Sequence, residues 1–221
     1  MILFISFTSC FRYREYTKDL RIFARVKTYK NIILDFGGVL LDWNPRYVFD
    51  SYFGDREKSE WFIRNVCTQD WNAEMDKGKP FDVAVAERIA LFPEWEEAIR
   101  LYQTDWIRMI GEEIPGMYQL ECDLKAAGYR LFGLTNWSLE TFNLVRGKRV
   151  FSILDGMVVS GEEHLLKPDP AFFQILLDRW NLRKEECLFT DDNLPNIVGA
   201  EAIGLPAVRF TDADSLRKLL L

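Results

Sequence analysis

A short apolar run that ends in an aspartate and a glycine pair constrains this chain more than any other feature. Ile32, Ile33 and Leu34 lead directly into Asp35, and the pair Gly37-Gly38 follows closely. An apolar run bounded by turn residues predicts a fully buried strand. We therefore expect Asp35 at the carboxyl end of a core strand, which is where open α/β sheets bind ligands. Taken alone, such an aspartate is as typical of a turn as of a site.

From Ile114 onward the chain alternates predicted strands with predicted helices. The expected strands are Tyr129–Leu134, Phe151–Val159, Cys187–Thr190 and Pro206–Phe210. The expected helices begin after Pro115-Gly116 and end at Gly128, begin at the N-caps Ser138 and Asp169, and cover Leu194–Ile203 and Asp212–Leu221. This alternation predicts an α/β protein with a doubly wound parallel sheet.

Between Trp43 and about Glu112 the pattern changes to aromatic and aliphatic residues at helical spacings. Such spacing predicts amphipathic helices that cover the carboxyl edge of the sheet as an inserted cap. The aromatic density is more typical of a small helical core than of a cofactor site, although Trp71 and Asn72 are candidates for facing a ligand. We predict an N-terminal extension over residues 1–30, a core over 31–46 and 113–221, and a helical cap over 47–112.

Composition limits the partners and the compartment. The 221 residues carry a net charge of −6 and contain no long Lys/Arg block, so we do not expect a nucleic-acid partner. The four cysteines are far apart and His164 is the only histidine, which argues against a zinc site or a disulfide scaffold and favours the cytoplasm. The apolar N-terminal stretch is too short to span a bilayer and has the wrong flanks for a secretory signal, so no membrane association is expected.

Four polar clusters stand at one edge of the predicted sheet, each just after a predicted strand or in a loop on the same edge. They are Asp35, Thr135-Asn136, Lys167 and Asp191-Asp192. Neighbouring carboxylates repel one another unless a cation neutralises them, and oxygen ligands without imidazole or thiolate select Mg²⁺. A hydroxyl, backbone amides and one lysine beside such a metal favour a phosphoryl group. An aspartate in line with the phosphorus can act as a nucleophile.

The fragments ILDFGGVLLD, LTNWS, LLKPDP and FTDDNLPNI resemble, in order, the four motifs of the haloacid dehalogenase (HAD) superfamily. The resemblance implies a Rossmann-like core with a helical cap and a Mg²⁺-dependent hydrolase. It implies that Asp35 is the nucleophile and a Mg²⁺ ligand, and that Thr135 and Lys167 hold the phosphoryl group with the backbone amide of Asn136. It also implies that Asp192 binds Mg²⁺ directly, Asp191 directly or through water, and Gly37 through its carbonyl.

One departure from the family pattern concerns Gly37. Family phosphatases usually carry a second aspartate at this position, which protonates the leaving oxygen and activates water. Such help is worth on the order of 10²–10⁴ in rate. Water, a cap residue or Asp42 are the candidates to replace it, although Asp42 fits a structural role at the hinge better. His164, Glu162 and Glu163 are expected to be solvated loop residues.

Three functions remain open at this point. The first is a phosphatase of small phosphorylated metabolites, including sugar phosphates, that works through a phospho-Asp35 intermediate. The second is a 2-haloacid dehalogenase, whose chemistry needs no metal and would not require the Asp191-Asp192 pair. The third is a non-catalytic relative that binds a phosphorylated ligand or a protein. We predict the first; the pattern indicates neither the substrate nor the oligomeric state.

Overall fold

The computed structural model describes residues 29–221. The expected N-terminal extension and Cys10 therefore lie outside the described residues, apart from the last two residues of that extension. No helix in the described part of the chain is long and apolar enough to cross a membrane. The three cysteines in it, Cys67, Cys122 and Cys187, are free thiols.

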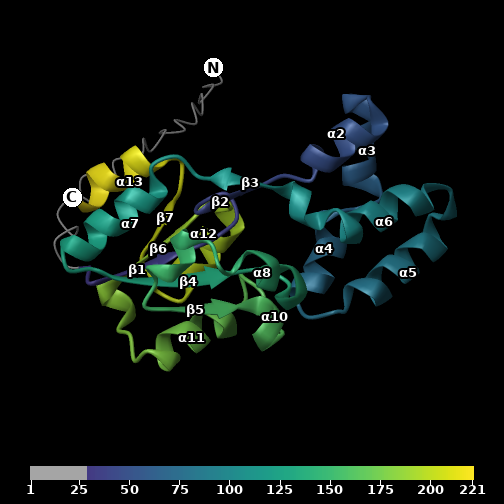
Figure 1. Cartoon of the computed structure of the whole chain (residues 1–221). Helices are drawn as coiled ribbons and strands as arrows, with labels where there is room; N and C mark the ends of the chain where they lie inside the picture. The colour runs from purple at the N-terminus through teal and green to yellow at the C-terminus, as the bar shows by residue number, and fades with distance from the viewer. Residues whose placement is uncertain (1–28) are drawn as a thin grey trace, which may run out of the picture.

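A five-stranded parallel sheet forms the core, in the order β5-β4-β1-β6-β7 (Figure 1). Its strands are β1 (Asn31–Leu34), β4 (Arg130–Thr135), β5 (Gly156–Val159), β6 (Cys187–Asp191) and β7 (Ala207–Arg209). The first strand lies in the middle of the sheet, as its uninterrupted apolar sequence requires, because both of its faces are covered. The predicted doubly wound α/β fold is confirmed.

Helices cover both faces of the sheet. The core helices are α7 (Met117–Ala126), α8 (Leu139–Val145), α9 (Arg149–Ser152), α10 (Ser160–Glu163), α11 (Pro170–Arg179), η4 (Lys184–Glu186), α12 (Leu194–Ala202) and α13 (Ala213–Leu220). Ile32 and Leu34 belong to the apolar cluster that contains α7 and α13, whereas Ile33 belongs to the cluster with α11 and α12. This alternation along β1 places one sheet between two helical layers.

The predicted strand Phe151–Val159 is wrong in its first half. Phe151 lies in α9 and packs against Phe36 and Phe142, with ring centroids 4.6 and 5.4 Å apart. A turn follows, and the side chain of Asp155 accepts a hydrogen bond from the Leu131 amide at 2.7 Å before β5 begins. An apolar run cannot by itself distinguish a buried helical turn from a buried strand.

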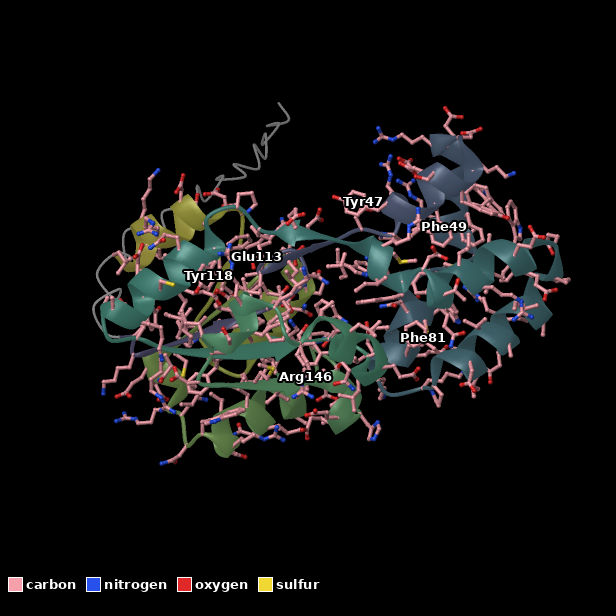
Figure 2. The ribbon with its side chains drawn as sticks, in the orientation of Figure 1. Tyr47, Phe49, Phe81, Glu113, Tyr118 and Arg146 are labelled. Carbon is pink, nitrogen blue, oxygen red and sulfur yellow. The ribbon has the colours of Figure 1, made fainter. Side chains whose placement is uncertain are left out.

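The inserted segment forms a helical lobe beside the core (Figure 1). It contains α2 (Arg46–Phe53), α3 (Arg56–Asn65), α4 (Gln69–Asp76), α5 (Phe81–Leu91), η2 (Pro93–Trp95), α6 (Glu96–Thr104) and η3 (Trp106–Met109). Phe49 and Phe81 lie within this lobe (Figure 2), and both are buried. We call this lobe the cap.

Two short strands connect the cap to the core. They are β2 (Leu41–Trp43) and β3 (Ile110–Glu113), which pair antiparallel in a separate ribbon. Asp42 lies in this ribbon, where Tyr47 donates a hydrogen bond to its carboxylate. A Cβ on Gly111 would lie 2.6 Å from an Asp42 oxygen, so glycine at this position leaves room for the Asp42 carboxylate.

Candidate active site

Three strand ends bring the predicted site residues together. Asp35 directly follows β1, Thr135 ends β4 and Asp191 ends β6. Because β1 lies between β4 and β6, these residues meet at one edge of the sheet. The Asp35 amide donates to the carbonyl of Thr190 at 3.0 Å, which continues the ladder one residue beyond the strand.

Lys167 joins two carboxylates at the centre of the site. Its Nζ lies 2.7 Å from Asp35 Oδ1 and 2.7 Å from Asp191 Oδ2. The lysine belongs to the loop before α11, and its side chain is almost completely buried. Burial by itself would lower the pKa of Lys167, but the two carboxylates raise it above its ordinary value, so the ammonium stays charged.

The side chain of Asn136 holds the backbone of Lys167. Asn136 Oδ1 accepts from the Lys167 amide at 2.8 Å, and Asn136 Nδ2 donates to the Lys167 carbonyl at 3.0 Å. This pair of bonds fixes the loop that carries the lysine. The sequence indicated a role for the backbone amide of Asn136, and nothing in the motif pointed to this use of its side chain.

The three carboxylates form an oxygen-rich cluster. Asp35, Asp191 and Asp192 each offer an oxygen, and these oxygens lie within 4.8 Å of one another. Asp191 is fully buried and also accepts from Asn193 N at 2.8 Å and Asn196 Nδ2 at 3.0 Å. Asp192 is exposed. Three hard oxygen donors, one of them open to solvent, fit the preference of Mg²⁺.

Electrostatics favour a cation at this cluster. Burial raises the pKa of Asp35 despite the opposing charge of Lys167. Burial, followed by the charge of Asp191, also raises the pKa of Asp192. The ammonium of Lys167 therefore faces a cluster of three carboxylates, and the ionised forms of Asp35 and Asp192 are disfavoured. A divalent cation would relieve this repulsion.

The glycine pair shapes the loop after Asp35. Gly38 has a φ of +75°, and a Cβ there would lie 2.6 Å from Asp192 Oδ2, so only glycine lets this loop approach the carboxylate. At Gly37, in contrast, a Cβ would meet no atom within 4 Å. The site therefore has room for the side chain that the family pattern places at Gly37.

A cavity of about 840 Å³ lies over these residues, between core and cap. The core contributes Asp35, Gly37, Asn136, Lys167 and Asp192. The cap contributes residues of α3, α4, α6 and η3, which are Ile63, Gln69, Asp70, Asn72, Ala73, Asp76, Tyr102 and Trp106.

Several expectations about individual residues are settled by this geometry. Asn72 lines the cavity, whereas Trp71 is buried in the cap and its Nε1 donates to Ala84 O at 3.2 Å. Thr135 is 1% exposed at the end of β4 and is not among the residues that line the cavity. Asp42 and His164 are not among the lining residues. His164 is exposed, but its Nδ1 contacts the cap at 3.0 Å from Lys77 O.

Asp76 is a lining residue that sequence reasoning missed. It follows no strand and belongs to no motif, and its carboxyl reaches the core only because the cap folds over the sheet. Its Oδ1 accepts from the Ser138 amide, beside β4, at 3.0 Å.

Comparisons with known proteins agree with this fold. A sesquiterpene phosphatase of Aspergillus oryzae is 27% identical over 191 residues, which cover 84% of this chain and 92% of that protein. An (S)-2-haloacid dehalogenase of Pseudomonas is 34% identical over 88 residues, 39% of either chain. A HAD family enzyme of Bacteroides thetaiotaomicron, solved as a magnesium complex, has a TM-score of 0.66 at 16% identity and covers 84% of this chain and 94% of its own.

The family comparison extends over most of the chain. The family described as haloacid dehalogenase-like hydrolase matches residues 29–204, a range that includes the strands β1, β4, β5 and β6 of the sheet, the cap and all four polar clusters. The chain therefore belongs to the haloacid dehalogenase-like hydrolases.

Proposed function

We propose that this hydrolase is a Mg²⁺-dependent phosphatase of small phosphorylated metabolites. Asp35 is the nucleophile, and its carboxylate attacks phosphorus to form an aspartyl-phosphate. The observation that carries the proposal is the position of Lys167, which touches Asp35 directly at 2.7 Å beside an open carboxylate cluster. A buried cation beside the nucleophile stabilises the charge on phosphoryl oxygens.

Mg²⁺ would be held by Asp35, Asp192 and the carbonyl of Gly37, with Asp191 as a direct or water-mediated ligand. When bound, it supplies positive charge to the phosphoryl oxygens. Thr135 and the backbone amide of Asn136 complete the phosphoryl site in this proposal, with Lys167 as the third contact.

The cavity favours a substrate with a single phosphate whose remaining part is uncharged. Among the lining residues, the cationic side chains are Lys167 and Arg209, and Lys167 is already engaged by two carboxylates. The cap residues that line the cavity include Asp70 and Asp76 and, among the described residues, no lysine or arginine, so the cap offers no charge to balance a second anionic group. Sugar phosphates fit this charge pattern.

The apolar part of the cavity wall fits a second class of substrate equally well, one in which the phosphate is attached to an apolar group. Trp43, Ile63, Trp106 and Trp137 line the cavity, and such side chains bind either the faces of a sugar or an isoprenyl chain. The similarity to a sesquiterpene phosphatase supports including isoprenyl monophosphates among the substrates to be tested.

The alternative functions are less well supported. A 2-haloacid dehalogenase has no need of a third carboxylate held open beside the nucleophile, as Asp192 is. A purely binding role would not require the buried contact between Lys167 and the nucleophile Asp35. We also propose that residues 47–112 move as a cap, with the β2–β3 ribbon as the hinge, and close over the substrate. In this proposal the enzyme is cytoplasmic.

The deciding experiment measures phosphate release from sugar phosphates, acyl phosphates and isoprenyl monophosphates, with Mg²⁺ and with EDTA. We expect Mg²⁺-dependent release from at least one class and none from Asp35→Asn. Glu74→Gln is the control, because Glu74 lies on the exposed side of α4, paired with Lys79, and should keep wild-type activity. Turnover by Asp35→Asn, or metal-independent halide release from a 2-haloacid in place of phosphate release, would overturn the proposal.

A further inference from the structure

We propose that Asp76, the last residue of the cap helix α4, is the general acid and base that the core loop lacks at Gly37. The inference rests on the proposed phosphatase function. It assigns the missing proton transfer to a residue outside the four motifs, contributed by the cap.

Asp76 shares the substrate cavity with the reacting groups. It lines the same cavity as Asp35, Gly37 and Lys167, on the wall that the cap contributes. Its residue surface is half-buried, so its carboxyl belongs to the core–cap interface but remains open to the cavity. A leaving group attached to a phosphoryl group at Asp35 would extend toward this wall.

The carboxyl of Asp76 is held in one orientation. Oδ1 accepts from the Ser138 amide at 3.0 Å, and Oδ2 accepts from Asn72 Nδ2 at 2.7 Å. Tyr102 donates its hydroxyl hydrogen to Asn72 Oδ1 at 2.9 Å, which turns the NH₂ group of Asn72 toward Asp76. Each oxygen thus has one protein donor, and the carboxyl keeps the capacity to carry a proton in addition.

The backbone around Asp76 is also anchored to the core. Ser160 Oγ donates to the Asp76 carbonyl at 2.6 Å, and His164 Nδ1 lies 3.0 Å from the carbonyl of Lys77. Gly78 permits this approach, because a Cβ there would lie 2.4 Å from the His164 ring. These contacts fix the end of α4 against α10 and its C-cap residue His164, so the acid is positioned whenever the cap is closed.

The local electrostatics suit proton transfer near neutral pH. Burial raises the pKa of Asp76 to about 7, and the charge of Asp35 adds to this effect, while the Ser138 amide opposes it. A group with such a pKa is partly protonated at pH 7 and can act first as an acid and then as a base.

The proposed reaction has two steps, and Asp76 transfers a proton in each. Asp35 attacks phosphorus, the bond from phosphorus to the leaving oxygen breaks, and Asp76 gives its proton to that oxygen, which leaves as a neutral alcohol. A water molecule then attacks the phosphorus of phospho-Asp35 and gives a proton to the Asp76 carboxylate, while the bond from phosphorus to the Asp35 oxygen breaks and its electron pair returns to the Asp35 carboxylate. Inorganic phosphate leaves, and both aspartates return to their starting states.

The test compares Asp76→Asn with wild type on two substrates of different leaving-group strength. For an alkyl or sugar phosphate, we expect kcat/KM to fall by about 10² or more, the usual range for lost general acid help. For p-nitrophenyl phosphate, whose phenolate leaves without a proton, kcat/KM should fall by less than about tenfold. Glu74→Gln removes a carboxylate from the exposed side of α4 and serves as the matched control.

A second readout does not depend on turnover. If Asp76 also activates water, phospho-Asp35 should accumulate when Asp76→Asn is given p-nitrophenyl phosphate, because the first step then needs no proton and only hydrolysis is slowed. The phosphoenzyme would be visible by mass spectrometry of the quenched intact protein. A rescue variant adds a third readout, because Gly37 has space for a side chain. The double variant Gly37→Asp, Asp76→Asn should hydrolyse alkyl phosphates at least tenfold faster than Asp76→Asn alone, a gain within the range available to general acid catalysis.

The outcomes separate this inference from the proposed function. Equal losses on both substrates, with no phosphoenzyme and no rescue, would show that Asp76 only fastens the cap and would overturn the inference while the phosphatase stands. An unchanged alkyl phosphatase rate in Asp76→Asn would do the same. Absence of phosphate release by wild type would overturn the proposed function, and the inference with it.

Discussion

Glu121 provides a test of how burial without a partner sets the stability of the core. It lies on α7 with a relative exposure of 0%, and neither carboxyl oxygen has a hydrogen-bond partner among the described residues. Burial raises the pKa of Glu121 from 4.5 to about 9, and the charge of Glu113 adds to the shift. Glu113 and the neighbouring Tyr118 mark this region in Figure 2.

The sign and the size of the effect of Glu121 on stability follow from the difference between its pKa values in the folded and the unfolded state. The folded state keeps the proton up to about pH 9, whereas the unfolded carboxyl loses it near pH 4.5, so stability falls as pH rises between these values. Each pH unit in this window is worth about 1.4 kcal/mol. At pH 7 the carboxyl of Glu121 therefore destabilises the fold by about 3 kcal/mol.

We predict that Glu121→Gln, which has the same shape and no titration, stabilises the protein by about 3 kcal/mol at pH 7 and by almost nothing near pH 4.5. The measurement is urea unfolding of both proteins at several pH values and constant salt. Glu112→Gln removes a carboxylate from an exposed position of β3 and should leave the pH dependence unchanged. A difference between wild type and Glu121→Gln that stays constant from pH 4.5 to 9 would refute the reasoning.

Three further predictions concern the site. Gly38→Ala places a Cβ on a residue with a φ of +75° and 2.6 Å from an Asp192 oxygen, so we expect a loss of stability of about 1–2 kcal/mol in urea unfolding. A Mg²⁺ titration should show a higher Mg²⁺ concentration at half-maximal activity. Lys167→Met leaves two buried carboxylates unpaired, so we expect no turnover and about 3–5 kcal/mol less stability without metal; an unfolding midpoint equal to wild type would contradict this. Because burial raises the pKa of Asp76 to about 7 and leaving-group protonation needs the acid form, the ratio of wild-type to Asp76→Asn alkyl phosphatase kcat/KM should fall as pH rises past 7; a flat ratio argues against the assignment.

Local patterns in the sequence predicted most of the core. Asp169 accepts from the Ala171 amide at 2.9 Å as the expected N-cap of α11, and Gly128 and Gly204 follow α7 and α12 with positive φ. These signals are local, because a cap or a C′ glycine acts within one helical turn. Ser138 is the exception, since it stands at the N-cap of α8 without a side-chain cap bond.

Features that depend on distant pairing could not be predicted. The β2–β3 ribbon joins Leu41 to Glu113 through strands of only three and four residues, which leave no periodic signal. Asp76 meets Ser138 across 62 positions of sequence, and only the packing of the cap on the core brings them together.

The sequence by itself determined which residues stand at the carboxyl ends of the strands. That much follows from a parallel sheet, in which every strand ends at the same edge, so Asp35, Asn136 and Asp192 meet at that edge. Lys167 lies in the loop between α10 and α11, so its place beside them depends on how that loop folds. Only the tertiary structure decided that Lys167 bridges Asp35 and Asp191, and that Asp76 of the cap faces them. Those contacts depend on how a lobe packs over an edge, and side-chain packing between distant segments leaves no pattern in the local sequence.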